Sequence, residues 1–438
     1  MRVALGIALL AAAGFALTQG GGAPELRAVS APARSIDARE GALLAAREFR
    51  TPAQLLMVRP GTLRPVGRPL RLDEAFINDY ALSPDGTRLA IGSDMGSTIE
   101  LVDLRRWRSL GTIELPEPRP SGYGGTSGLT WPSPRRLMVL SAAHSLGASP
   151  LVLDPVARRV VRRSDWRGRA LLWDAHGRRL VVLAASRGGA RPRPASLMTY
   201  DVRGRLRELR LTRILAGFGD GGTGPARDLT PALAVDWKSD RAYVVSTDGL
   251  LVAEVNLRSA RLEYHELSEP RTALQHLRDL IEPPAHAKGE PVHVRTRFAE
   301  VLPNGAIAVT GEDRPATRRH LARPIPFGLR LIDSRSWTVR TVDSESQDFS
   351  VAGGVVLARR WSMGGDGLDG IGVRAYDTAG TPRWSRFEGA DVIVRGAAGR
   401  HAHVEVKQSG RRSIQVLELD SGRTVRTLPW RELRVLDR

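Results

Sequence analysis

LVDLRRWRSLGTI, residues 101–113, places two short apolar segments on either side of a turn, and Asp103 ends the first of them. Alternating apolar residues around a turn are typical of a β-hairpin. The pattern returns along the chain with an acidic or amide residue in the same position, which suits a side chain that stabilises the turn. The further copies lie at Asp154, Asp201, Asn256, Asp333, Asp377 and Asp420, and one near Met57 has Arg59 in this position.

A second hairpin precedes seven of these copies. Its turns include the stretch SPDGTR, residues 83–88, and LPNG, residues 302–305. Asp-Gly and Asn-Gly suit tight hairpins because glycine accepts a positive φ at little cost. Two hairpins per repeat give four antiparallel strands, which is the blade of a β-propeller. The sequence therefore predicts an all-β propeller.

The repeat count predicts eight blades, with seven as the alternative. Seven complete units run from about Ala81 to Trp430, and residues 55–72 supply the last two strands of another unit. Residues 42–49 are the expected strand before them, and residues 432–437 are the expected first strand. A blade shared by both termini would close the ring and remove an exposed sheet edge. The propeller domain is thus expected over residues 42–438.

Two repeats resemble those of known propeller families. The stretch LSPDGTRLAIGSD from Leu82, with IELVDL after it, is similar to repeats of bacterial exported WD40-like propellers. AYDTAGTPRW, residues 375–384, resembles a repeat of the quinoprotein-like family, and the resemblance implies that Trp384 docks its blade against a neighbour. Propeller repeats serve many functions, so the resemblance implies a fold and leaves the activity open.

The chain is basic and free of cysteine. Its formal charge is +18, and only three of its 65 basic residues are lysine. This charge favours an anionic partner, although an arginine-rich composition also arises from a GC-rich genome. Because the charge forms no block runs, nucleic acid is the less favoured partner. Without cysteine, disulfides, thiolate metal sites and cysteine nucleophiles are excluded.

The N-terminus is typical of an export signal. Arg2 precedes an apolar run, residues 3–17, and a small-residue stretch, residues 20–23. We therefore expect residues 1–23 to be a signal peptide or an N-terminal anchor and residues 24–41 to be a linker. The protein is expected to be exported, to the cell envelope or beyond. An uncleaved anchor would be its one contact with a membrane, since the run is short for a transmembrane helix.

The long segments of the chain are expected on one face of the ring. In a four-stranded blade, the loop between the second and third strands emerges on the same face as the connection to the next blade. Seven long segments obey this rule, and binding residues concentrate on such loops. Insertions also accumulate where they are tolerated, so the alternative is a face without function. The segments are 116–128, 142–150, 187–196, 215–230, 268–296 (with a helix expected over 269–282), 312–327 and 362–370.

Candidate binding residues come from these segments. A basic cluster in the 312–327 segment suits phosphate or carboxylate, and two glycine-rich loops add a tyrosine and an aspartate. The candidates are Arg314, Arg318, Arg319, His320, Arg323, Tyr123 and Asp220.

We predict no metal site and no cofactor. The subsidiary metal candidates are Asp366 and Asp369, which lack calcium-loop spacing, and His401, His403 and Glu405, which alternate along one strand and so share a face. The sequence shows no coherent catalytic triad.

These features predict a non-catalytic binding or scaffolding module, because a repeat-built fold can use a chain of this length as a single domain. The expected partner is a protein or an anionic envelope polymer, and the chain is expected to be a monomer. Two alternatives stay open. One is a propeller enzyme, either a quinoprotein-like oxidoreductase, a hydrolase or a lyase, and the other is arginine-mediated adhesion to anionic polymers.

Overall fold

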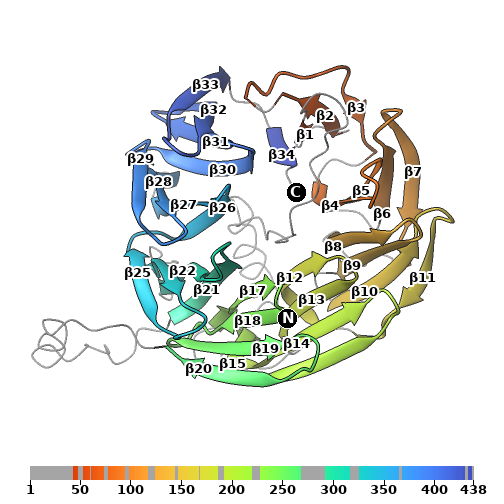
Figure 1. Ribbon diagram of the computed structural model, residues 1–438, viewed down its shortest axis with the longest axis horizontal. Helices are drawn as coiled ribbons and strands as arrows, with labels where there is room; N and C mark the ends of the chain where they lie inside the picture. The colour runs from red at the N-terminus through yellow and green to blue at the C-terminus, as the bar shows by residue number, and fades with distance from the viewer. Residues whose placement is uncertain are drawn as a thin grey trace, which may run out of the picture.

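The computed structural model describes residues 43–47, 53–59, 61–73, 77–93, 98–116, 124–143, 147–166, 168–185, 192–219, 227–267, 292–315, 325–364, 367–429 and 433–436. These residues form sheets arranged around a ring, with both ends of the described chain in the same sheet (Figure 1). The all-β propeller prediction is confirmed. Within the described ranges, no helix is long and apolar enough to cross a membrane.

Six of the sheets are antiparallel and four-stranded. The blade formed by the two termini contains β1 (Leu43–Arg47), β2 (Gln54–Val58), β3 (Leu70–Arg71) and β34 (Leu433–Leu436). The next two contain β4 (Ile77–Leu82), β5 (Arg88–Ser93), β6 (Thr98–Asp103) and β7 (Arg108–Glu114), then β8 (Gly124–Ser133), β9 (Arg136–Ala143), β10 (Gly147–Asp154) and β11 (Arg159–Arg163). The other three contain β17 (Ala232–Asp236), β18 (Arg241–Val245), β19 (Leu251–Asn256) and β20 (Leu262–Glu266); β26 (Asp348–Ala352), β27 (Val355–Gly364), β28 (Gly367–Asp377) and β29 (Pro382–Arg386); and β30 (Asp391–Ala398), β31 (His401–Gln408), β32 (Arg411–Glu418) and β33 (Thr424–Pro429).

The rest of the ring is one ten-stranded sheet. It contains β12 (Arg169–His176), β13 (Arg179–Ala185), β14 (Arg193–Asp201), β15 (Leu206–Gly219), β16 (Arg227–Thr230), β21 (Val292–Val301), β22 (Ile307–Pro315), β23 (Ile325–Pro326), β24 (Leu329–Ile332) and β25 (Val339–Asp343).

The predicted count of eight four-stranded blades is therefore wrong, and so is the alternative of seven, because the described chain has six such blades. The cause is β16, which pairs antiparallel with β15 and parallel with β21. β15 has 14 residues and extends beyond its partner β14. The backbone groups at the end of β15, residues 217–219, form hydrogen bonds with β16 instead. This pairing merges strands that the repeat pattern treats as separate units.

The ring is closed by strands from both termini. β34 pairs antiparallel with β1, in the register Leu436 with Leu44 and Leu433 with Arg47. The expected strand over residues 432–437 thus lies where the repeat count placed it. Without β34, the backbone groups on that side of β1 would form an open sheet edge.

The recurring acidic residue stabilises the turn that follows it, as predicted. The Oδ1 atom of Asp103 accepts hydrogen bonds from the backbone N–H groups of Arg105, at 3.0 Å, and Arg106, at 2.9 Å. Equivalent bonds form at Asp154, Asp201, Asn256, Asp333 and Asp377. In the last blade the prediction of Asp420 is wrong, because Glu418 is the residue that ends the third strand before the turn. Glu418 pairs with His401, and its backbone N–H donates to the carbonyl of Arg423 across the turn.

The hydrophobic core lies between adjacent sheets. One cluster joins Ile99 and Leu101 of the second blade to Leu129, Val139 and neighbouring residues of the third. Trp384 of β29 donates its indole N–H to the carbonyl of Leu419, at 2.9 Å, so the blade docking implied by the resemblance is confirmed. Sequence reasoning missed three further tryptophans that reach a neighbouring sheet: Trp107 to the carbonyl of Arg68, Trp237 to Asp174, and Trp337 to the ring of His265.

Gly422 should be intolerant of a side chain. Its φ is 66°, and a Cβ atom there would lie 2.5 Å from Trp384. Gly86 is a matched control, since its φ is 67° and a Cβ there would meet nothing within 4 Å. We expect Gly422→Ala to lose at least about 1 kcal/mol more free energy of unfolding than Gly86→Ala, because it adds overpacking to the same backbone strain. Equal losses in denaturant titrations would show that Trp384 is not held by this contact.

Candidate functional site

The two ends of the ring differ in their connections. At one end lie the short turns within hairpins, where neighbouring sheets touch: Arg179 pairs with Asp240, and the Asn304 side chain donates to the carbonyl of Thr378 at 2.9 Å. Because neighbouring strands are antiparallel, the long segments begin and finish at the other end of each sheet, away from the short turns. There Arg295, near the start of β21, pairs with Asp248 of the β18–β19 connection. We call these the turn end and the loop end.

Much of the predicted loop face lies outside the described residues. This applies to Tyr123, Asp220, Arg318, Arg319, His320, Arg323 and Asp366, and to the helix expected over 269–282. Asp369 lies in β28, and its side chain is not among those described. Binding by these residues stays a prediction.

Arg314 is the candidate anion ligand that the structure describes, and it is already engaged. It lies near the end of β22, where its Nε donates to Oε1 of Glu312 at 2.5 Å. Both side chains are largely buried, at 11% and 9% exposure. Burial raises the pKa of Glu312, and Arg314 opposes that rise. Arg314 therefore belongs to the framework of the loop end and is not a free surface arginine.

Arg297 is the centre of this framework. Its side chain is 3% exposed, and Nη1 lies 2.7 Å from Oδ1 of Asp313 on the neighbouring strand β22. The same nitrogen donates to the carbonyls of Thr296 and Glu312, each at 3.1 Å. Burial lowers the pKa of Arg297, and Asp313 counteracts this. A buried guanidinium with this many acceptors is held in one geometry.

An aromatic ring lies between two of the arginines. The guanidinium carbons of Arg297 and Arg330 lie 4.0 and 4.1 Å from the ring centroid of Phe327. Such contacts are cation–π interactions, which strengthen when the cation is desolvated. Phe327 follows the 316–324 segment in the chain, so this packing fixes one end of the segment that carries the predicted basic cluster.

The cluster and the sequence beside it are rich in arginine. Four arginines (295, 297, 314 and 330) gather there with the carboxylates of Asp248, Glu312 and Asp313, and burial raises the pKa of Glu312. The adjacent residues 316–324 contain Arg318, Arg319 and Arg323 and no acid. The loop end here offers an excess of positive charge. Sequence reasoning missed Arg295 and Arg297, although the alternation VHVRTRF places both on one face of a strand.

Two of the three subsidiary metal candidates on β31 are buried in the fold. His403 is fully buried, and Glu405 is 3% exposed. Nε of Arg395 donates to Oε2 of Glu405 at 2.9 Å, and Arg412 lies 3.7 Å from its other oxygen. A metal ion needs its ligand atoms close together, and those of His401, His403 and Glu405 do not all lie within 4.8 Å of one another. Among the described residues, another group does reach this spacing.

That spacing is reached by Glu254, Glu263 and His265, which the sequence analysis did not select. Two carboxylates and an imidazole are donors that zinc accepts. However, Arg241 pairs with Glu254, and Arg261 lies 2.6 Å from Glu263. The ring of His265 stacks on Trp337 at 3.6 Å, and its Nε2 lies 2.9 Å from Glu254. The arginines already neutralise both carboxylates, so this cluster serves to dock β20 against the β24–β25 turn.

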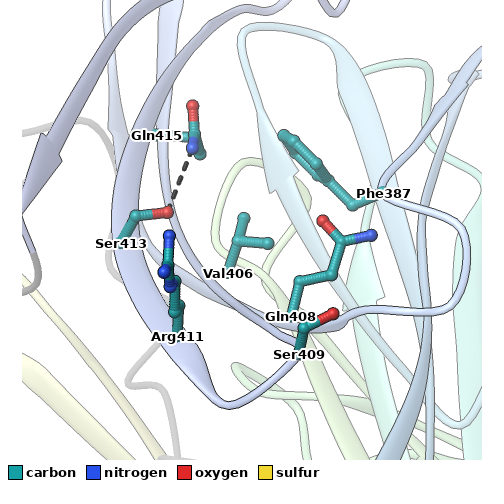
Figure 2. A pocket seen from close by; sticks show the side chains of 7 residues that line it. All are labelled: Phe387, Val406, Gln408, Ser409, Arg411, Ser413 and Gln415. Atoms are coloured by element: carbon teal, nitrogen blue, oxygen red, sulfur yellow. Dashed lines mark hydrogen bonds between the residues drawn. The ribbon is translucent and has the colours of Figure 1, made fainter.

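A groove at the loop end is more open to a ligand. It has a volume of about 270 Å³ and lies between the turn after β29 and the β31–β32 hairpin. Figure 2 shows Phe387 on one side, Ser413 and Arg411 on the other, and Val406 between them. Gln408, Ser409 and Gln415 complete the lining, and the amide of Gln415 donates to the Ser413 hydroxyl at 3.0 Å. The groove thus combines one aromatic side chain with amide, hydroxyl and guanidinium groups.

Asp174 gives the fold a specific pH dependence. It is 3% exposed on β12, and burial raises its pKa well above 3.8 although the indole of Trp237 donates to it at 3.1 Å. The folded state then binds a proton that the unfolded state releases, so the free energy of unfolding falls as pH rises above about 3.8. We expect Asp174→Asn to flatten this fall and to be more stable than wild type at pH values well above 3.8, because the amide has no proton to lose. Urea unfolding at several pH values tests this, and parallel profiles for the two proteins would contradict it.

Known proteins share the fold and little sequence. No family model matches the chain, and no curated protein matches it in sequence. Dihydro-heme d1 dehydrogenase NirN, solved in complex with DHE, is similar in structure over 89% of this chain and 74% of its own, with a TM-score of 0.57 and 12% identity. At that identity the likeness establishes the β-propeller fold alone.

Two further solved structures have TM-scores below 0.5 and add nothing to that conclusion. Dipeptidyl peptidase 4 of Porphyromonas gingivalis has a TM-score of 0.48 at 13% identity, over 90% of this chain and 60% of its own. The β-propeller domain of Cps50 (Swd1) from Myceliophteria thermophila has a TM-score of 0.40 at 12% identity, over 77% of this chain and 94% of its own.

Proposed function

We propose that this chain is an exported, non-catalytic binding propeller whose loop end holds an anionic partner. The observation that carries the proposal is the position of residues 316–324, which contain three arginines and no acid, beside the buried arginine cluster around Arg297. Buried ion pairs hold the base of that segment, while Arg318, Arg319 and Arg323 supply charge beyond it. An anionic envelope polymer or an acidic protein surface is the partner that this charge favours.

The buried arginines act as a support in this proposal. Arg297 and Arg314 are engaged by Asp313 and Glu312, so their charges are committed to the fold. These buried ion pairs hold the strand end that precedes residues 316–324 in one geometry. Contact with the partner is therefore assigned to the 316–324 segment, and Arg314 is assigned to positioning.

Charge reversal tests the loop end. We expect the triple variant Arg318→Glu, Arg319→Glu and Arg323→Glu to lose most of the salt-sensitive retention of the protein on a polyanion resin. The matched control reverses three exposed arginines of the turn end: Arg178, Arg203 and Arg335. Arg179 is left out of the control because it pairs with Asp240 and lies over Trp237.

Both triple variants change the net charge equally, so overall charge cannot explain a difference between them. Loss of retention in the control with retention kept in the loop variant would overturn the face assignment. Absence of retention in the wild-type protein at low salt would overturn the anionic partner. Turnover in a substrate screen with added metal or quinone would favour the enzyme alternative.

Export is the second part of the proposal and rests on Arg2 and the apolar run 3–17. In a native-like host, the protein should be recovered outside the cytoplasm. Full-length protein recovered from the cytoplasm in soluble form would remove the envelope polymer as a partner.

A further inference from the structure

We propose that the groove between Phe387 and the β31–β32 hairpin binds one acidic sugar unit, a hexuronate. The groove does not include the 316–324 segment, so the inference adds a small-ligand site to the proposed function and does not depend on the arginine cluster there. It is carried by a groove of suitable size, by an exposed arginine with no ion pair to the described residues, and by an amide held in a fixed orientation.

The first observation is the state of its polar groups. Near the loop end, Arg295, Arg297, Arg314, Arg359 and Arg395 are all held by carboxylates. Arg411 differs, because its guanidinium makes no ion pair or hydrogen bond with the described part of the chain, and it is exposed at the groove. The amide of Gln408 and the hydroxyl of Ser409 are likewise unengaged by described residues. A guanidinium fork matches a carboxylate bidentately.

The second observation is the backbone of Phe387. Its φ is 59°, in the left-handed region that bulky residues rarely occupy. The turn is held by a hydrogen bond from the Ala390 N–H to the Phe387 carbonyl, at 2.9 Å. Ser409, on the opposite side of the groove, has a φ of 50°. The positive φ of Ser409 belongs to the two-residue turn Ser409–Gly410, which joins Gln408 to Arg411, so tight turns hold both sides of the groove in place.

The third observation is a preset hydrogen-bond pair. The Gln415 amide donates to Ser413, at 3.0 Å, and its carbonyl accepts from the Thr427 hydroxyl, at 2.7 Å. The orientation of the amide is therefore fixed before a ligand arrives. Amide and hydroxyl groups both donate and accept, which matches the vicinal hydroxyls of a sugar. The apolar face of a pyranose ring can lie on Phe387 and Val406.

The volume of the groove matches a single sugar unit. A volume of about 270 Å³ equals the liquid volume of about nine water molecules. That is enough for one hexose-sized ring and too little for an extended peptide. The carboxylate is assigned to Arg411, the ring to Phe387, and the hydroxyls to the glutamine and serine side chains.

Calorimetric titration of the full chain with glucuronate, glucose and acetate tests the assignment. We expect glucuronate to bind at least about tenfold more tightly than either glucose or acetate, because it alone engages both Arg411 and Phe387. Arg411→Gln should reduce glucuronate affinity about tenfold and leave glucose affinity unchanged. The matched control, Arg335→Gln, removes an exposed arginine at the turn end and should change neither.

Phe387→Leu separates the ring contact from the charge contact and keeps an apolar side chain in the fold. It should weaken glucuronate and glucose by the same factor. No detectable glucuronate binding at millimolar concentration, or acetate binding as tightly as glucuronate, would overturn the proposal. The outcome is independent of the polyanion experiment, since Arg318, Arg319 and Arg323 are intact in these variants.

Discussion

Deletion of residues 431–438 is expected to abolish the cooperative unfolding transition or to lower the melting temperature by more than 10 °C. The deletion removes β34, which pairs with β1 across four residues from Leu433 to Leu436. Leu44 and Ala46 of β1, both buried in the core beside the second blade, would then sit in an edge strand. An open edge also favours pairing between molecules, so we expect aggregation to increase.

The control for this deletion is removal of residues 437 and 438 alone, which keeps β34 whole. That variant should melt within about 2 °C of wild type, because substitutions and truncations outside packed elements change stability little. Differential scanning calorimetry with light scattering measures both effects. Equal melting temperatures for the two truncated proteins would show that the ring does not depend on its closing strand.

Arg297→Met is expected to lower the free energy of unfolding by about 3 kcal/mol. Removing the guanidinium leaves Asp313 without its closest cation and leaves the carbonyls of Thr296 and Glu312 without that donor. Methionine keeps much of the volume, so the loss reports the polar contacts more than a cavity. Phe327 would also lose one of its two cation–π partners.

The double variant Arg297→Met with Asp313→Asn separates these contributions. It should recover part of the loss, because no uncompensated charge remains beside β21. Arg335→Met, an exposed arginine at the turn end, should change stability by less than about 0.5 kcal/mol. Chemical denaturation measures all three, and an Arg297→Met protein as stable as the Arg335→Met protein would contradict a framework role for Arg297.

The fold was predictable where local chemistry repeats. An acidic residue that accepts two backbone N–H bonds is a short-range feature, so the turns after Asp103, Asp333 and Asp377 could be read from the chain. The choice of Glu418 over Asp420 could not be predicted in this way. Both residues are acidic, and only the strand register shows which of them precedes the turn. The sharing of one blade by the two termini followed from counting strands.

The blade count failed because it depended on long-range pairing. β16 has four residues, RDLT, which carry no alternation of apolar residues, and its partner β21 lies more than sixty residues farther along the chain. No local pattern signals such a strand. The candidate site was limited in a similar way: Arg314 looks like a surface arginine in sequence, and its burial depends on Glu312 pointing to the same side of β22.

Hydrogen–deuterium exchange of the full chain, with and without a soluble polyanion, tests whether the loop end holds an anionic partner. The account predicts protection in peptides that span residues 292–327, at the loop end, with little change in the hairpin turns at residues 174–179 and 333–338. Protection confined to those turns, or none at a polyanion concentration that saturates binding, would contradict a loop end that holds an anionic partner.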